Sequence, residues 1–361
     1  MKHRIVVKIG SNVLTRDDGS LDVTQMSSLV DQVAALVDLH YEVILVSSGS
    51  ITSGRSELKV KHRLDSVEQR QLYSAVGQVK LLGHYYDLFR ERGIKIGQIL
   101  TMKENFSTRR EYLNQRACMT VMLQNGVIPI VNENDTVSVT ELMFTDNDEL
   151  SGLIASMMNA ESLIILSNVD GIFNGEPCDP HSHVIRQLSP DADVSTFIQE
   201  EKSSFGRGGM ITKCRIASRV ASEGIRVCIA NGRRPQILTD IVTRPTETVF
   251  TEFLPGMENV SSVKKWIAHS AGFAKGVVHI NRQAAEALLN NDRAVSLLLV
   301  GTTAIEGDFD EGDIVSIVDE ANKEIAIGRS GYGADEARSL IGKHNQKPLV
   351  HYDYLFMNES K

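Results

Sequence analysis

The 361-residue sequence has little that marks a secreted or membrane protein. Its four cysteines include no CxxC pair, which favours free thiols in a reducing compartment. No run of about 18 apolar residues is present, and Met1 leads almost directly into a predicted strand without the apolar stretch of a signal peptide. We therefore expect a cytoplasmic protein that makes no membrane contact.

Positive charge and the common catalytic motifs are also scarce. The net charge of −8 argues against a chain that binds nucleic acid or a membrane surface as a whole. The sequence contains no GxxxxGK[ST] phosphate loop and no Ser-His-Asp or Cys-His arrangement for nucleophilic catalysis. Its length and its 42% of hydrophobic residues are sufficient for two domains with separate cores.

Apolar, β-branched runs alternate with helical patterns through the first part of the chain. The helical pattern over residues 24–39 lies between predicted strands at 4–9 and 42–46, which predicts a βαβ unit. Further predicted strands are residues 94–101, 126–131 and 162–166, and further predicted helices are residues 67–92, 108–124 and 149–158. In the helix at 67–92, the apolar residues Leu72, Val76, Val79 and Leu82 recur at helical spacing. This alternation predicts an α/β fold with a mainly parallel open sheet flanked by helices.

Small polar residues follow several of these strands. Gly10-Ser11, Ser48-Gly49 and Ser167-Asn168 each come at or just after the end of a predicted strand. In open α/β sheets, ligands bind beyond the carboxyl ends of the strands. Glycine at such a position lets the backbone approach a ligand closely. The sequence therefore predicts a ligand site at this edge of the sheet.

Two clusters of acidic and amide residues follow the strand at 126–131. They are residues 132–135 and 146–148, and the Val/Thr alternation at 136–140 between them predicts a short strand. Asp146 stands at the expected N-cap of the helix at 149–158, where the helix dipole stabilises negative charge. Together the clusters suit a cation, an ammonium group or a metal-phosphate, although a solvated loop has a similar composition.

A glycine-rich segment at 206–213 precedes a predicted helix that runs to about residue 222. Its glycine amides, its helix N-terminus and Lys213 one turn into the helix suit an anion. Residues 175–183 hold Cys178, His181 and His183, but two prolines and the tight spacing favour a surface turn over a metal site.

Six motifs, taken in chain order, resemble those of the glutamate 5-kinases, a branch of the amino-acid kinase family. They are Val7-Lys8-Ile9-Gly10-Ser11, Ser47-Ser48-Gly49-Ser50, Ala75-Val76-Gly77-Gln78, residues 132–137, Asp146-Asn147-Asp148 and residues 206–213. The resemblance covers residues 4–255 and implies the amino-acid kinase fold. It also implies ATP-dependent phosphorylation of the γ-carboxylate of L-glutamate, the first step of proline biosynthesis, with Mg²⁺ bridging the ATP phosphates through few direct protein ligands.

The resemblance also implies roles for individual residues. Lys8 and Lys213 would flank the transferred phosphoryl group, and Asp148 would hold the two lysines in place. Ser48, Asp135 and Asn147 would bind glutamate. ATP contacts would come from Lys8, Gly10, Ser11, Gly49, Ser167, Asn168, Gly208, Gly209, Met210 and Lys213. A glutamate γ-carboxylate has a pKa of about 4.3 and is ionised at neutral pH, so the reaction needs no general base.

The pattern changes near residue 262. Apolar runs at 297–300, 312–317 and 324–328, with a predicted helix at 282–289, suggest a small mixed β-barrel that resembles the PUA domain of many glutamate 5-kinases. PUA domains usually bind RNA, but residues 261–361 carry 11 Lys and Arg against 14 Asp and Glu, a net charge of −3. We therefore expect domains at 1–257 and 262–361, the second with a structural or regulatory role.

Two alternatives stay open at this point. An RNA-binding or regulatory protein is the second functional class, and other amino-acid kinases, acting on aspartate, acetylglutamate, carbamate or a nucleoside monophosphate, share the two lysines and the glycine turns. The cluster at 132–137 and the PUA-like tail favour glutamate. The family further implies a homo-oligomer, either a dimer or a tetramer, and feedback inhibition by proline. The aromatic residues of 85–89 suit either a core or a subunit contact.

Overall fold

The structure, a computed structural model, describes residues 3–58, 60, 63–137, 144, 146–176, 179, 181–192, 209–256, 266–267, 273–289 and 295–357. The chain divides into two compact units. The first unit contains residues 1–103 and 114–259, and the second contains residues 104–113 and 260–361. The predicted domain limits at 257 and 262 fall outside the described residues and stay a prediction.

The first unit is built on one sheet, which among the described residues has eight strands in the order β3-β4-β2-β1-β5-β7-β8-β6. Neighbouring strands are parallel except for the antiparallel pair β7–β8. The bounds are β1 Arg4–Ile9, β2 Glu42–Ser47, β3 Lys95–Thr101, β4 Val127–Glu133, β5 Ser162–Ser167, β6 Gln187–Leu188, β7 Arg226–Asn231 and β8 Thr251–Phe253. This sheet confirms the predicted mainly parallel α/β fold.

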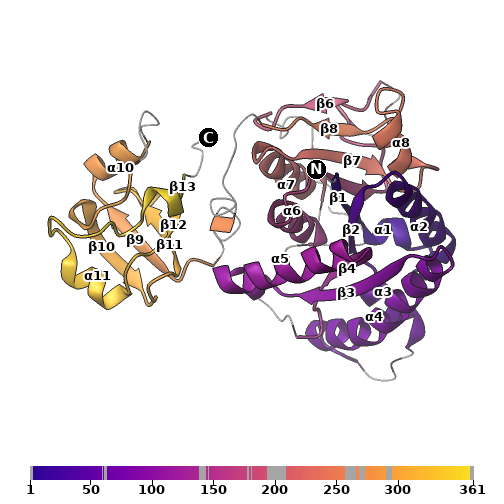
Figure 1. The fold of residues 1–361 in the computed structure, drawn as a ribbon, viewed down its shortest axis with the longest axis horizontal. Helices are drawn as coiled ribbons and strands as arrows, with labels where there is room; N and C mark the ends of the chain where they lie inside the picture. The colour runs from indigo at the N-terminus through magenta and orange to yellow at the C-terminus, as the bar shows by residue number, and fades with distance from the viewer. Residues whose placement is uncertain are drawn as a thin grey trace. The chain divides into compact units, whose positions relative to one another are not determined.

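Helices cover both faces of the sheet (Figure 1). Their bounds are α1 Ser11–Leu14, α2 Val23–Asp38, α3 Ser50–Glu57, α4 Ser66–Arg90, α5 Arg109–Gln124, α6 Asn147–Met157, α7 Met210–Ser222 and α8 Ile237–Thr243. Side chains of a strand alternate between faces. Ile5, Val7 and Ile9 of β1 therefore join the core beneath α2, α4 and α8, whereas Lys8 points to the face that α6 and α7 cover.

The helix α4 buries a different face from the predicted one. The sequence pattern relates Leu72, Val76, Val79 and Leu82 at helical spacing, yet Val79 is 76% exposed and Leu72 is exposed as well, whereas Val76 and Leu82 are half-buried. The buried face instead carries Arg70, Ser74, Gly77, Leu81, Tyr85 and Phe89. Tyr85 and Phe89 are fully buried in the core of the first unit, so their sequence signal is that of a core rather than a subunit contact.

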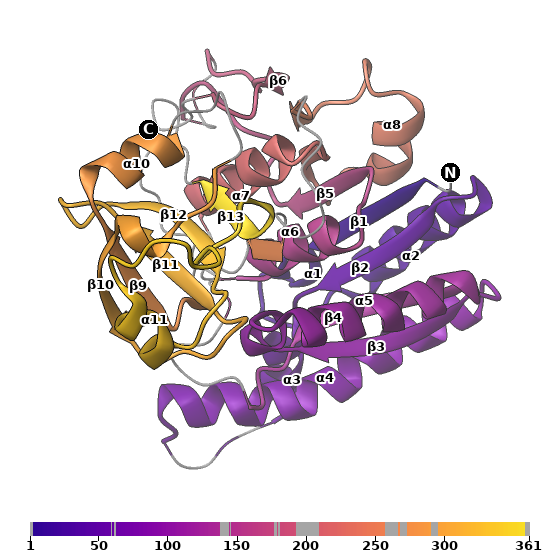
Figure 2. The same ribbon diagram turned by 60° about the vertical axis from the view of Figure 1, so that its left-hand side comes forward.

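Two glycines explain this choice of face, because they let α3 and α4 pack backbone against backbone. A Cβ atom at Gly77 would lie 1.7 Å from the carbonyl oxygen of Ser50, and one at Gly54 would lie 1.9 Å from that of Tyr73. The close approach places α4 beside the first half of α3, and side chains of α4 also bond to the loop after β4. Figures 1 and 2 both show α4 alongside β3 at the edge of the sheet.

We expect Gly77→Ala to destabilise the protein by about 1–3 kcal/mol or more, because the added methyl group overpacks a contact between two backbones. Gly83→Ala is the matched control, since Gly83 lies in the same helix and its Cβ would meet no atom within 4 Å. There the higher helix propensity of alanine should stabilise the protein by roughly 0.5–1 kcal/mol. Urea unfolding of both variants tests this, and equal effects would contradict the packing argument.

The second unit contains a mixed sheet in the order β10-β9-β11-β12-β13, antiparallel except for the β9–β11 pair. The bounds are β9 Gly276–Ile280, α10 Arg282–Leu289, β10 Thr302–Gly307, β11 Ile314–Val318, β12 Glu324–Arg329, α11 Ala334–Leu340 and β13 Leu355–Met357. The predicted helix at 282–289 is confirmed. Residues 299–301 form a 3₁₀ turn rather than part of a strand, and Thr302 begins β10.

Residues 104–113 group with the second unit, which the sequence did not predict. The indole Nε1 of Trp266 donates a hydrogen bond to the carbonyl oxygen of Phe106 at 2.9 Å. The guanidinium of Arg109 lies over the rings of Trp266 and Tyr112. Trp266, Phe106 and Tyr112 are each about 1% exposed. Within the described ranges, no helix is both long and apolar enough to cross a membrane.

Candidate active site

A cavity of about 320 Å³ opens at the carboxyl ends of β1, β2, β4 and β5. It belongs entirely to the first unit. The first turns of α3, α6 and α7 also contribute to its wall. Ten of the predicted site residues line it, namely Lys8, Gly10, Ser11, Ser48, Gly49, Asp135, Asn147, Asp148, Ser167 and Lys213. The structure therefore brings together residues that are far apart in the sequence.

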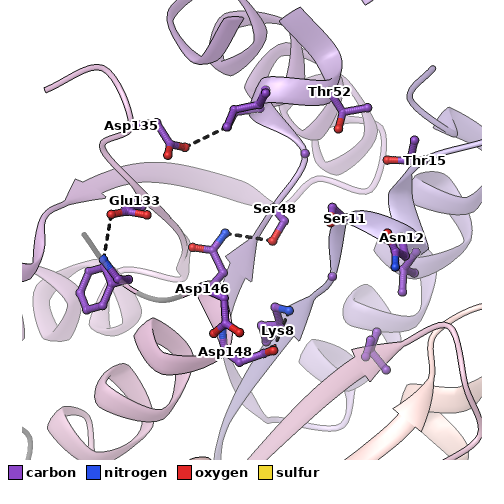
Figure 3. Close-up of a pocket in the computed structure, with 18 of the residues that line it drawn as sticks. Lys8, Ser11, Asn12, Thr15, Ser48, Thr52, Glu133, Asp135, Asp146 and Asp148 are labelled. Atoms are coloured by element: carbon purple, nitrogen blue, oxygen red, sulfur yellow. Dashed lines mark hydrogen bonds and ion pairs between the residues drawn. The ribbon is translucent and has the colours of Figure 1, made fainter. Parts of the chain in front are cut away.

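Lys8, Asp148 and Lys213 form a buried chain of charges in this cavity. Nζ of Lys8 lies 2.6 Å from Oδ1 of Asp148, and Nζ of Lys213 lies 2.9 Å from Oδ2 of the same carboxylate (Figure 3). Burial alone would raise the pKa of Asp148, but the two ammonium groups outweigh burial and hold it below its usual value. One carboxylate thus fixes two ammonium groups, which are placed to contact phosphate oxygens.

Asp146 caps the helix that carries Asp148, as the sequence predicts. Its Oδ1 accepts hydrogen bonds from the backbone N–H groups of Asp148 at 2.9 Å and Glu149 at 3.0 Å. Its Oδ2 is buried and has no hydrogen-bond partner among the described residues. Burial, together with the neighbouring charge of Asp148, raises the pKa of Asp146 to about 6. The cavity wall therefore contains one carboxylate that titrates close to neutral pH.

The shifted pKa predicts a pH dependence of stability. Because the folded pKa lies above the unfolded value of about 3.9, the folded chain binds more protons than the unfolded chain between about pH 4 and 6. The contribution of Asp146 to the free energy of unfolding therefore falls as the pH rises through that window.

Asp146→Asn keeps a capping oxygen and removes the titration. We expect its stability relative to the wild type to rise on the order of 2 kcal/mol from pH 4 to 7 in urea unfolding. A constant difference would contradict the assignment.

Asn147, the first residue of α6, connects three segments of the chain at the centre of the site. Its Nδ2 donates hydrogen bonds to Oγ of Ser48 at 2.9 Å and to Oδ1 of Asn132 at 3.1 Å. Ser48 follows β2, and Asn132 lies near the end of β4. The first turn of α6 is thereby tied to the ends of two strands, as expected if the two polar clusters of the sequence fold toward each other.

Asp135 lies at the other end of the cavity from Lys8 and Asp148 (Figure 3). Its Oδ1 accepts a hydrogen bond from Nε of Arg70 at 2.7 Å, and Nη2 of Arg70 also reaches Oε2 of Glu133 at 3.1 Å. Oδ2 of Asp135 has one weak contact, with Oγ of Ser50 at 3.4 Å. Thr136 and Val137 form a turn instead of the predicted strand, and residues 138–140 lie outside the described residues.

Arg70 is a site residue that the sequence analysis missed. It is 8% exposed and lines the cavity between two carboxylates. A signal was present, because Arg70 continues the buried face of α4 defined by Ser74 and Gly77 at spacings of four and three residues. That face carries no large apolar side chain before Leu81, so the periodicity of apolar residues did not reveal it.

The glycine turns have the backbone geometry that a close ligand requires. Gly49 caps α3 with φ +104°, a conformation that favours glycine. A Cβ atom at Gly10 would lie 3.0 Å from the carbonyl oxygen of Leu166. Gly209 is the N-cap of α7 and Met210 its first residue, but neither lines the cavity, and the same holds for the exposed Asn168. Gly208 lies outside the described residues. The ATP contacts of these four residues stay predictions.

The thiols and histidines show no sign of a metal site in the described part of the chain, where no group of three or more His, Cys, Asp or Glu side chains is placed to hold an ion. Cys178 lies outside the described residues, and the His183 ring contacts Asn174. Burial raises the pKa of Cys214 and Cys228 to about 12, so neither thiol ionises near neutral pH.

Comparisons with known proteins agree with this geometry. The model of the amino acid kinase family matches residues 3–231, and the model of the PUA domain matches residues 276–352. A curated protein called glutamate 5-kinase from Bacteroides thetaiotaomicron is 62% identical over 354 residues, which is 98% of this chain and 98% of its own length. Another glutamate 5-kinase, from Chlorobaculum tepidum, is 46% identical over 355 residues, or 98% of this chain and 97% of its own.

Proposed function

The chain belongs to the amino acid kinase family, and on this basis we propose that its cavity transfers the γ-phosphoryl group of ATP to the γ-carboxylate of L-glutamate. The products are L-glutamyl 5-phosphate and ADP, and the reaction is the first step of proline biosynthesis. The observation that carries the proposal is the polarity of the cavity, with two lysines held by Asp148 at one end and Asp135 at the other.

The cationic end supplies what this phosphoryl transfer demands. The acceptor carboxylate is already an anion, so the barrier comes from bringing two anions together in line. Lys8 and Lys213 place two ammonium groups around one carboxylate, ready to neutralise charge on the transferred group. Gly49 lines the cavity, so its backbone N–H group is placed to bind a phosphate oxygen, whereas the N–H group of Gly10 donates to the carbonyl oxygen of Leu166 at 3.2 Å.

We expect Mg²⁺ to bind together with ATP. Both oxygens of Asp148 are engaged by lysines, whereas the buried Oδ2 of Asp146 has no partner among the described residues. These residues would fit a metal ion held mainly by ATP phosphates, with Oδ2 of Asp146 free to contact the ion or its water. When bound, Mg²⁺ supplies further neutralisation of phosphate charge.

The acidic end suits the amino group of the substrate. Asp135 presents Oδ2 toward Ser50 and the cavity, while Arg70 occupies Oδ1. An ammonium group at Oδ2 would be paired with a carboxylate whose position is already fixed by Arg70. Ser48 lies between this end and Lys8 (Figure 3) and accepts a hydrogen bond from Asn147, so both side chains are placed to contact the body of glutamate.

A hydroxamate assay tests the proposal. The purified protein is incubated with ATP, Mg²⁺ and hydroxylamine, which traps an acyl phosphate, and with L-glutamate, L-aspartate or N-acetyl-L-glutamate. We expect hydroxamate formation with L-glutamate, at a kcat/KM well above that of the other acids. A higher kcat/KM with aspartate or N-acetylglutamate would assign the chain to another reaction of the same family.

The oligomeric state, an inhibitor and the cellular location of the protein can also be inferred. We infer a homo-oligomer, a dimer or tetramer, because the outward face of α4 exposes Leu72, Val79 and Tyr86 to solvent. We also infer inhibition by proline and a cytoplasmic location, which follow from the role in proline biosynthesis. The net charge of −3 in residues 261–361 supports a structural or regulatory rather than RNA-binding second unit. Light scattering and inhibition assays with proline measure the first two properties.

A further inference from the structure

Among the residues that the structure describes, four basic side chains line the cavity, and one of them differs from the rest. Lys8 and Lys213 pair with Asp148, and Arg70 pairs with Glu133 and Asp135. Arg55 of α3 also lines the cavity, yet among the described residues it has no carboxylate partner. Its side chain is exposed and rests on the ring of Tyr73, with the guanidinium carbon 5.6 Å from the ring centroid. This stacking orients a guanidinium that pairs with no carboxylate in the part of the chain that the structure describes.

The position of Arg55 along α3 relates it to Asp135. Ser50 begins α3 and contacts Oδ2 of Asp135, and Arg55 follows about 7.5 Å further along the helix axis. Ile51 and Thr52, which lie one turn before Arg55 on the same side of the helix, line the cavity as well. In Figure 3, Thr52 and Asp135 lie on opposite sides of the same end of the cavity. Arg55 thus lines the part of the cavity wall that α3 forms, at the end where Thr52 and Asp135 lie and away from Lys8 and Asp148.

The charges at this end of the cavity match an α-amino acid. Glu133 and Asp135 carry two negative charges and Arg70 one positive charge, which leaves one negative charge for an ammonium group. The α-carboxylate of the same substrate needs a cation, and Arg70 is already shared by two carboxylates. With Arg55 included, this end of the cavity holds two charges of each sign, and the amino acid adds one more of each. An isolated carboxylate moved out of water without such a partner is costly.

Resting on the proposed function, we infer that Arg55 binds the α-carboxylate of the amino-acid substrate while Asp135 binds its α-ammonium group. The planar guanidinium presents parallel N–H donors to both oxygens of a carboxylate. Arg55 and Asp135 together fix the α-carbon, and the side chain of the substrate then extends toward Ser48 and the lysines. Arg55 is thus a specificity-determining residue, since it selects acceptors that carry a free α-carboxylate.

Three compounds that share the reacting carboxylate separate the two contacts. L-Glutamate carries both α-substituents, 4-aminobutyrate lacks the α-carboxylate, and glutarate lacks the α-ammonium group. Each is measured by ADP release or, where turnover is slow, by its inhibition constant against glutamate. In Arg55→Gln we expect the glutamate KM to rise roughly 10- to 100-fold, as for loss of a hydrogen-bonded charge pair, with kcat and the ATP KM little changed. The KM or inhibition constant of 4-aminobutyrate, which has no α-carboxylate to lose a contact, should change less than about twofold.

Three further variants extend this test. Arg55→Lys keeps the charge but loses the planar fork, so its glutamate KM should lie between those of the wild type and Arg55→Gln. Arg90→Gln is the matched control, because Arg90 also lies 5.6 Å from an aromatic centroid, that of Tyr86, but does not line the cavity. Arg90→Gln should leave the constants for L-glutamate, 4-aminobutyrate and glutarate unchanged. Asp135→Ala should show the converse pattern, weakening 4-aminobutyrate and sparing glutarate.

The outcomes distinguish this inference from the proposed function. If Arg55→Gln weakens glutamate and 4-aminobutyrate by the same factor, or weakens neither, Arg55 does not bind the α-carboxylate, although the kinase activity stands. If the wild-type protein phosphorylates no compound of this series, the proposed function fails and the inference fails with it. If Arg55→Gln does not fold, the comparison of Arg55→Lys with the wild type gives the same decision.

Discussion

Removal of either lysine ammonium group is expected to lower kcat on the order of 100-fold or more in Lys8→Ala and Lys213→Ala, with a smaller change in the glutamate KM. The reason is that both side chains are fixed by Asp148 where negative charge builds up in the transition state. Each variant leaves Asp148 one remaining lysine, so the buried carboxylate is not stranded and the protein should stay folded.

Lys80→Ala serves as the control for this experiment. Lys80 is also ion-paired with a carboxylate, that of Glu57, but it does not line the cavity. Its kcat should match that of the wild type. Near-normal turnover in a folded Lys8→Ala or Lys213→Ala protein would remove that lysine from the mechanism, whatever its geometry.

Loss of the Asp135 carboxylate is expected to have the second large effect, this time on binding. Removing one partner of a desolvated, hydrogen-bonded charge pair costs about 2–5 kcal/mol, which is roughly a 30-fold to several-thousand-fold loss of affinity. Asp135→Ala should therefore raise the glutamate KM by a factor in this range while the ATP KM changes little. Asp135→Asn, which keeps the shape and loses the charge, should behave similarly.

The alternative is that Asp135 serves only to hold its loop through Arg70. In that case both variants would lose stability and bind glutamate normally. The loop has other attachments to α4, since Nε2 of Gln71 donates to the carbonyl oxygen of Thr136 and Nδ2 of Asn132 donates to Gln78. Steady-state kinetics on folded protein decide the question, and an unchanged glutamate KM would discard the ammonium assignment.

Much of the first unit was predictable because its signals are local. The strand at Arg4–Ile9, the helix N-cap at Asp146 and the start of α7 at Met210 depend on residues within one or two turns of each other. The ends of parallel strands meet at one edge of a sheet, so the motifs that follow β1, β2 and β4 were expected to converge. The family comparison agrees with the resemblance that those motifs carry.

What the sequence by itself determined in the first unit is strands β1 to β5, helices α2, α4, α5, α6 and α7, their order, and the edge of the sheet where a ligand is expected, because periodicity, capping and turn chemistry act over a few residues. Only the tertiary structure decided which face of α4 is buried, since Gly77 must meet Gly54 on another helix for the backbones to touch. It alone placed Arg70 between Glu133 and Asp135 and joined Lys8 to Lys213 through Asp148. Such pairings depend on the approach of distant segments, and no local pattern encodes them.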